Sequence, residues 1–356
     1  MAARSGGAVR VARVACRVAC VAVLATTAVA CGSSSSSHRS TGTPEPTESE
    51  FVPLPTPTGT PVAAMTLAHS LTLPTNRPGT VQAWGDDGSG QTDLPDGLSN
   101  VVAMSAGDAF SIALKSDGTV VAWGDDEDGQ IDLPGDLSGI VAVAAGGSHS
   151  LALKADGTVE AWGADDVGQT DIPSGLSGVI AVSAAGSFSV ALRQDGTVIA
   201  WGDDSQGQTD VPAGLAGVKA ISAGYDFVLA LMADGTVRAW GDKTPTSATA
   251  EVTVLPKGLS GVTAISAGYI HALALKSDGT VVAWGANDDG ESTVPEGMPK
   301  AVAISAGGTF SVALLADGTV RAWGGNDLGQ STVPTGLAHV EAVDAGGVHT
   351  VALVAP

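Results

Sequence analysis

The sequence predicts an all-β protein, a seven-bladed β-propeller with four antiparallel strands per blade. Its seven tryptophans recur with five spacings of 39 residues and one of 44, at Trp84, Trp123, Trp162, Trp201, Trp240, Trp284 and Trp323. A period near forty in a β pattern is typical of propeller blades. In six of the seven units an Asp-Gly pair stands shortly before the tryptophan. The 48 glycines suit short strands joined by tight turns.

Charge and cysteine content argue against two classes of protein. The 356 residues include 37 Asp and Glu against 16 Lys and Arg, a net charge of −21. Nucleic-acid binding needs positive charge toward phosphates, so no nucleic-acid partner is expected. The three cysteines, Cys16, Cys20 and Cys31, all lie near the N-terminus. A disulfide framework is therefore not expected in the rest of the chain.

Residues 1–30 have the layout of a secretory signal peptide, with four arginines followed by the apolar run Val18–Ala30. The small residues Ala28-Val29-Ala30 before Cys31 resemble the bacterial lipobox, in which the cysteine is acylated and becomes the new N-terminus. We therefore predict lipidation at Cys31. The protein would be exported and anchored by lipid to the cell membrane, facing outside the cytoplasm. Plain secretion and a retained anchor are the alternatives.

Residues 31–63 are rich in Ser, Thr and Pro and hold few large apolar side chains. Such a segment cannot bury enough surface to offset its chain entropy. We predict a tether there and assign the propeller to residues 64–356, in repeats of about 39 residues.

One unit shows how each predicted strand is recognised. Ser150–Leu153 and Thr158–Trp162 flank the pair Asp156-Gly157. Asp-Gly between two such runs predicts a hairpin turn in which both residues have positive φ. The short segment Gln169–Pro173 ends in proline, as an outer edge strand does, and predicts a further strand. The apolar run Val179–Ala184 then begins the next unit.

The units AGGSHSLALKADGTVEAWG and AGYIHALALKSDGTVVAWG resemble repeats of the regulator of chromosome condensation family. The resemblance covers about residues 65–356 and implies a propeller. It is strongest to secreted bacterial members, which include propeller-type protein inhibitors of β-lactamases. The resemblance therefore implies an alternative function, inhibition of β-lactamase or of a cell-wall transpeptidase.

The ring should close through its ends. The chain finishes with His349–Leu353, a strand of the kind that normally precedes an Asp-Gly turn, but no turn follows. Thr80–Trp84 has no well-formed strand before it. Pairing these two would remove an exposed edge. The segment His69–Leu73 resembles the same strand and is the alternative for this position.

Strand direction divides the loops between two ends of the blades. The Asp-Gly turns form one end, called the DG face below. The loops after each Trp-Gly and the Ala-Gly turns form the other, called the acidic face. We predict that this face binds a protein partner with a basic patch through Tyr225, Tyr269, Asp125, Asp126, Asp165, Asp166, Asp203, Asp204, Asp226, Asp242, Asp288 and Asp289. The protein is expected to be a monomer that meets the membrane only through its lipid. A solvated rim that merely maintains solubility is the alternative.

Enzymatic activity is not predicted, and no catalytic residue, cofactor or metal is assigned. Nucleophilic catalysis needs a Ser or Cys beside a His and an acid, a pattern that the repeats do not offer. His149, His271 and His349 occupy a position held by Phe in other units, which indicates packing. The loop Asp126–Gly129 has some oxygen-ligand character for Ca²⁺ and leaves calcium binding open.

Overall fold

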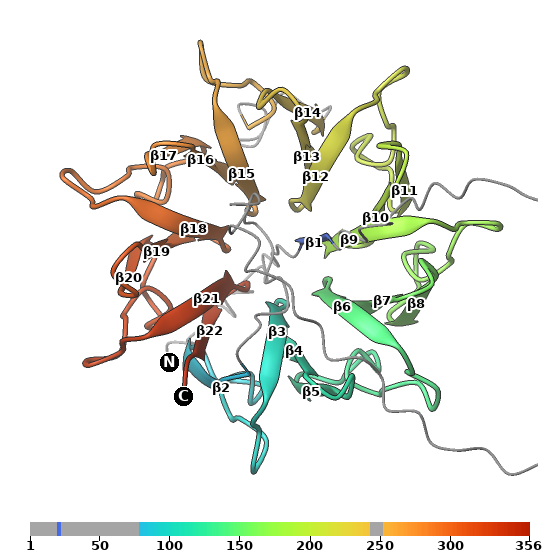
Figure 1. Ribbon diagram of the computed structural model, residues 1–356, viewed down its shortest axis with the longest axis horizontal. Coiled ribbons are helices and arrows are strands. Elements are labelled where there is room, and N and C mark those ends of the chain that lie inside the picture. The colour runs from blue at the N-terminus through green and yellow to red at the C-terminus, as the bar shows by residue number, and fades with distance from the viewer. Residues whose placement is uncertain (1–19, 23–77, 243–251) are drawn as a thin grey trace, which may run out of the picture. The chain divides into compact units, whose positions relative to one another are not determined.

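The computed structural model describes residues 78–242 and 252–356, together with a short strand at residues 20–22. Within these ranges the regular secondary structure consists of β-strands, which form seven antiparallel sheets. Figure 1 shows the sheets arranged radially, with one edge strand of each sheet nearest the centre. The predicted all-β propeller is confirmed. No helix of the described part is long and apolar enough to cross a membrane.

The sheets follow chain order. The described strands from residue 78 onward supply three strands to each sheet, and β1 (Cys20–Ala22) is a fourth strand in sheet 3. Sheets 1 to 3 contain β3 (Val101–Ala106), β4 (Phe110–Lys115), β5 (Val120–Gly124); β6 (Ile140–Ala145), β7 (His149–Lys154), β8 (Val159–Gly163); and β9 (Val179–Ala185), β10 (Phe188–Arg193), β11 (Val198–Gly202). Sheets 4 to 6 contain β12 (Val218–Ala223), β13 (Phe227–Met232), β14 (Val237–Gly241); β15 (Val262–Ala267), β16 (His271–Lys276), β17 (Val281–Gly285); and β18 (Ala301–Ala306), β19 (Phe310–Leu315), β20 (Val320–Gly324).

Sheet 7 joins the two ends of the propeller. It contains β21 (Val340–Ala345), β22 (His349–Val354) and β2 (Thr80–Gly85). β2 pairs with β22 from Thr80 opposite Val354 to Gly85 opposite His349. The predicted closure is therefore confirmed, and the C-terminal strand holds the position. The alternative segment, 69–73, lies outside the described residues.

The N-terminal predictions are largely untested by the structure. The strand β1 (Cys20–Ala22) lies in the predicted leader and pairs with β9 of sheet 3. The rest of the leader, and the tether at 31–63, lie outside the described residues.

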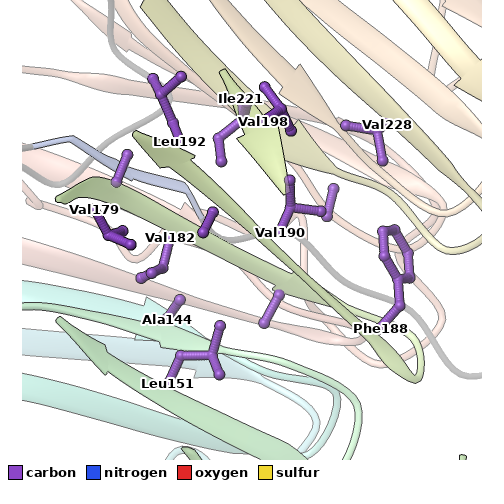
Figure 2. Packing of buried hydrophobic residues seen from close by; sticks show 14 of the residues in the cluster. Ala144, Leu151, Val179, Val182, Phe188, Val190, Leu192, Val198, Ile221 and Val228 are labelled. Carbon is purple, nitrogen blue, oxygen red and sulfur yellow. The ribbon is translucent and has the colours of Figure 1, made fainter. Parts of the chain in front are cut away.

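Both faces of a sheet are buried, because each sheet packs between two others. The pattern explains why β4 reads as the near-continuous buried run FSIALK. Figure 2 shows the packing of sheet 3, where Val182 and Val190 lie among side chains from neighbouring sheets such as Leu151 and Ile221. The first strands are rich in Ala and Ser, whose small size suits the close approach near the centre.

The tryptophans are core residues, as predicted, with exposed fractions of 4–8%. Six of the seven indoles donate a hydrogen bond to a carbonyl oxygen in the loop that precedes their sheet; Trp162 bonds to Gln130 at 3.0 Å. A buried indole N–H needs such a partner. Each of these six tryptophans therefore fixes one connecting loop against the sheet that follows it.

The hairpin turns form at the predicted positions but with a different backbone. Gly157 has a φ of 81°, whereas the φ of Asp156 is not positive. The Asp156 carboxylate accepts hydrogen bonds from the Thr158 N–H at 2.9 Å and from its hydroxyl. This local bond holds the aspartate in place and leaves only glycine in the left-handed region. The expectation of positive φ at both residues is wrong.

The predicted outer strand at Gln169–Pro173 is also wrong, since these described residues form no strand. In Gln169–Pro173 the backbone N–H groups bond within the loop, Asp171 to Gly168 and Ile172 to Thr170. The Gln169 carbonyl accepts a hydrogen bond from the Ser189 hydroxyl of the next sheet at 2.8 Å. The groups that a strand ladder would require are thus already engaged, and the segment folds as turns.

Candidate functional site

The structure brings the two predicted sets of loops to the same end of the sheets. The residue after each Trp-Gly donates its backbone N–H to the Ala-Gly turn of its own sheet. Examples are Asp125 to Ala109 at 2.8 Å and Asp242 to Asp226 at 2.9 Å. In each sheet the start of the loop after Trp-Gly therefore lies against the Ala-Gly turn, at the same end of the strands.

Seven equivalent turn positions surround the centre of this face. Four are glycine, and the set reads Asp108, Gly147, Gly186, Tyr225, Tyr269, Gly308 and Gly347. Backbone bonds link neighbouring turns, such as Gly347 N–H to the Gly107 carbonyl at 3.0 Å and Tyr269 N–H to that of Gly307 at 3.3 Å. A symmetric ring has no preferred binding position, so the three larger residues define one. We call Asp108, Tyr225 and Tyr269 the axial cluster.

The axial cluster reaches across the ring. Tyr269, in sheet 5, donates its hydroxyl to an Asp108 carboxylate oxygen in sheet 1 at 3.2 Å. The rings of Tyr269 and Tyr225 lie 5.6 Å apart between centroids, with their planes at 57°. A side chain at Gly347 would approach the Tyr269 hydroxyl to 3.2 Å. Glycine there leaves the space that the tyrosine occupies.

The two tyrosines differ in exposure, which the sequence did not indicate. Tyr269 is only 4% exposed, whereas Tyr225 is 36% exposed. Burial raises the pKa of Tyr269 well above its usual value, so its hydroxyl stays protonated and serves as a donor. Tyr225 is therefore the aromatic side chain that a partner can reach, and the buried Tyr269 ring packs against it.

Asp226 provides the unusual electrostatics of this region. Partial burial, together with the negative charges of Asp203 and Asp242, raises its pKa to about 6. The carboxylates of Asp203 and Asp242 thus lie near enough to act on Asp226, which follows the exposed Tyr225 in the chain. Asp242 is itself buried.

Many carboxylates of the acidic face have a structural role. Asp125 accepts a hydrogen bond from the side-chain amide of Gln130 at 2.8 Å, and Asp203 accepts one from Gln208 at 2.8 Å. These glutamines are buried and in turn accept a backbone N–H of the same loop. Sequence reasoning missed this pair, although the repeated spacing of five residues between Asp and Gln could have indicated it.

An aspartate at the second position after Trp-Gly acts in a similar way. Asp126, Asp165 and Asp204 each accept a backbone N–H from five residues later. Asp166, Asp288 and Asp289 are exposed on the loop tips. The predicted binding residues therefore divide into loop-forming acids, exposed acids, and the group around Tyr225. Asp108 belongs to that group although it was not among the predicted site residues.

The three histidines lie in the core, as their exchange with Phe predicted. Each is fully buried, and its Nε2 lies 2.8–2.9 Å from a serine hydroxyl of the next sheet. Burial lowers the pKa of His271 to about 3 and that of His349 to about 4. In the described ranges no group of three or more His, Cys, Asp or Glu is placed to hold a metal ion.

Comparisons with known proteins agree with this geometry. The family model described as "Regulator of chromosome condensation (RCC1) repeat" matches residues 101–130, 140–169, 179–208, 218–243, 262–291 and 301–330. Among curated proteins none matches the chain.

Solved structures share the fold. Prp20p from Saccharomyces cerevisiae aligns with a TM-score of 0.69 and 19% identity, over 82% of this chain and 94% of that one. Human WBSCR16 aligns with a TM-score of 0.63 and 20% identity, over 78% of this chain and 99% of that one. Identities this low show the fold alone.

Proposed function

Since the chain is built of regulator of chromosome condensation (RCC1) repeats, we propose that it is a non-enzymatic binding propeller that captures a protein partner on the acidic face. The observation that carries the proposal is the axial cluster. Three larger residues interrupt a ring of glycines. One of them, Tyr225, is exposed and precedes Asp226, whose pKa is raised in part by the charges of Asp203 and Asp242. Exposed aromatic side chains on a rigid scaffold are typical of binding surfaces.

The charge of this face indicates the kind of partner. The loops after the tryptophans carry acids, and the described bases lie on strands or near the DG face, as Lys154 and Arg193 do at the ends of β7 and β10. A partner with a basic patch would be steered to the acidic face, and salt would weaken the encounter. Structures of the yeast protein concern its binding to Gsp1p and histones and its complex with Kap60. Protein binding thus has precedent on this fold.

A capture experiment tests the proposal. The immobilised full chain should retain one or a few basic proteins from its source at low salt and release them at high salt. Tyr225→Ser should abolish capture, because it removes the exposed aromatic contact. Tyr269→Phe should weaken it, because it removes the bond that fixes the cluster to Asp108.

A charge change on the DG face provides the control. Glu296 is exposed beside the groove at the Asp278-Gly279 turn. Glu296→Gln and Asp226→Asn both remove one negative charge, but only Asp226→Asn should reduce capture. Capture should also weaken below about pH 6 as Asp226 takes up a proton. Equal effects of the two variants would show that net charge, and not the acidic face, binds the partner.

The cellular location and the class of bacterial protein are part of the same proposal. We infer an exported bacterial lipoprotein, monomeric and anchored through Cys31, on the lipobox-like Ala28-Val29-Ala30-Cys31. Mass spectrometry of the mature N-terminus should find lipid on Cys31, and Cys31→Ser should release the protein from membranes. An unmodified Cys31 would overturn this assignment.

Inhibition of β-lactamase or of a cell-wall transpeptidase is the more specific form of the same activity. It is supported by the resemblance to propeller-type inhibitors and by an acidic face that offers one exposed tyrosine. The added parent protein should then slow hydrolysis by a purified β-lactamase. The Tyr225→Ser variant should leave the rate of hydrolysis unchanged. Unchanged hydrolysis at saturating protein would exclude that enzyme as the partner.

A further inference from the structure

The sheets are joined near the centre by a repeated hydrogen bond. A serine hydroxyl on the first strand of one sheet accepts the backbone N–H of an alanine on the first strand of the next. These bonds run from Ala145 to Ser105, Ala223 to Ser183, Ala267 to Ser222, Ala306 to Ser266 and Ala345 to Ser305, at 2.9–3.1 Å. All of these bonds involve uncharged groups.

The joint between sheet 7 and sheet 1 departs from this rule. Asp344 on β21 stands where five other sheets have serine, and its Oδ2 accepts the Ala106 N–H of β3 at 2.9 Å. Its Oδ1 accepts the Ser305 hydroxyl of β18 at 2.9 Å. One carboxyl therefore contacts both neighbours of the sheet that joins the ends of the propeller. We call the contact of Asp344 with Ala106 the closing joint.

No basic side chain compensates this carboxyl from the strands packed against it. β3, β18 and β19 carry no ionisable residue, β22 carries only His349, and β21 itself also carries Glu341. His349 is buried and its pKa is lowered to about 4, so it is neutral near pH 7. Asp108, in the turn after β3, accepts the Tyr269 hydroxyl. Among the described strands that pack against it, ionised Asp344 is thus a buried charge that is supported by hydrogen bonds and faces no basic side chain.

We propose that Asp344 makes the closing joint a pH-sensitive latch, which is tight when the carboxyl is protonated and loosens when it ionises. Burial raises the pKa of Asp344 to about 7, while hydrogen bonds from Ala106, Ser305, Ala345 and Ser105 oppose this rise. A group with a higher pKa in the closed joint than in the open one binds its proton more tightly when closed. Raising the pH across this range therefore favours opening.

Amide hydrogen exchange on the purified full chain tests the latch. Two amides at equivalent positions of the fold, one bonded to Asp344 and one bonded to a serine, can be compared within one molecule. Ala106 N–H donates to Asp344, and Ala306 N–H donates to Ser266 with the same length, 2.9 Å. Exchange rates are corrected for the intrinsic effect of pH. The protection of Ala106 should fall more than tenfold between about pH 5.5 and 8.5, while that of Ala306 stays constant.

Exchanging the residues provides matched variants. Asp344→Ser installs the residue of the other joints and should make Ala106 insensitive to pH, and Asp344→Asn should do the same. Ser266→Asp should transfer the pH dependence to Ala306. The proposal is overturned if Ala106 keeps constant protection in the parent chain, if Ala106 and Ala306 lose protection together, or if Asp344→Ser retains the pH dependence.

Discussion

His271 provides a direct measure of how much a buried histidine destabilises this fold in acid. The side chain is fully buried, and its Nε2 lies 2.9 Å from the Ser311 hydroxyl of the next sheet. Burial lowers its pKa from 6.5 to about 3. We predict that His271→Phe makes the free energy of unfolding less sensitive to acid. Phe110 already stands at the equivalent position of sheet 1, beside Gly107 as His271 stands beside Gly268.

The sign follows from the lowered pKa. Below pH 6.5 the unfolded chain binds a proton at His271 that the folded chain does not bind, so stability falls as the pH falls. The loss continues until the pH reaches the folded value of about 3. Between neutral pH and about pH 5 the difference amounts to about 2 kcal/mol. This is a large part of the stability of a typical domain.

Urea unfolding at about pH 7.5 and pH 5 measures the effect. The difference in unfolding free energy between the two pH values should be about 2 kcal/mol smaller in the variant than in the parent chain. Asp344 contributes in the opposite direction, since its raised pKa adds stability as the pH falls below about 7. That contribution is present in both chains and cancels. Identical pH dependence in the two chains would refute the reasoning.

Three further perturbations test the fold. Deleting residues 349–356 removes β22, the central strand of sheet 7, and should cost several kcal/mol in unfolding free energy; an unchanged thermal melt would contradict closure by this strand. Gly346→Ala places a Cβ 2.3 Å from a facing carbonyl and should destabilise by about 1–3 kcal/mol in urea unfolding, whereas Gly135→Ala meets nothing within 4 Å and should be neutral. Gln130→Leu removes the buried amide bonded to Asp125 and should cost about 1–3 kcal/mol by thermal or urea unfolding; no loss would show the pair to be dispensable.

The sequence predicted what depends on local pattern and period. Tryptophan spacing and Asp-Gly pairs specify the hairpins, and the unmatched strand at each end specifies the closure through β2 and β22. These features repeat in register, so one unit supports the interpretation of the next. The failures concern side chains that bond to the backbone, which periodicity does not reveal. Gln169 and its neighbours engage the N–H and carbonyl groups that a fourth strand would have used.

The site was predicted in outline but not in its internal arrangement. Both tyrosines were expected to face a partner, yet Tyr269 lies buried across the ring because Gly347, in another sheet, leaves room for it. That contact depends on residues far apart in the sequence. Similarly, the acids of the loops were identified as a binding rim, whereas Asp125 and Asp203 hold their own loops together. A count of charges does not distinguish these roles.

The contacts of sheet 7 have a consequence for how the molecule is made. Most hydrogen bonds between neighbouring sheets join residues 20 to 45 positions apart, whereas Trp84 bonds to Gln330 and Ser111 to His349 across 246 and 238 positions. During synthesis, sheets 1 to 6 can pair and stack as they emerge from the ribosome. β2 must wait, unpaired, until the final strand has been translated. The chain thus carries an open strand edge from the synthesis of β2 (Thr80–Gly85) until that of β22 (His349–Val354), and chaperones would have most to protect there.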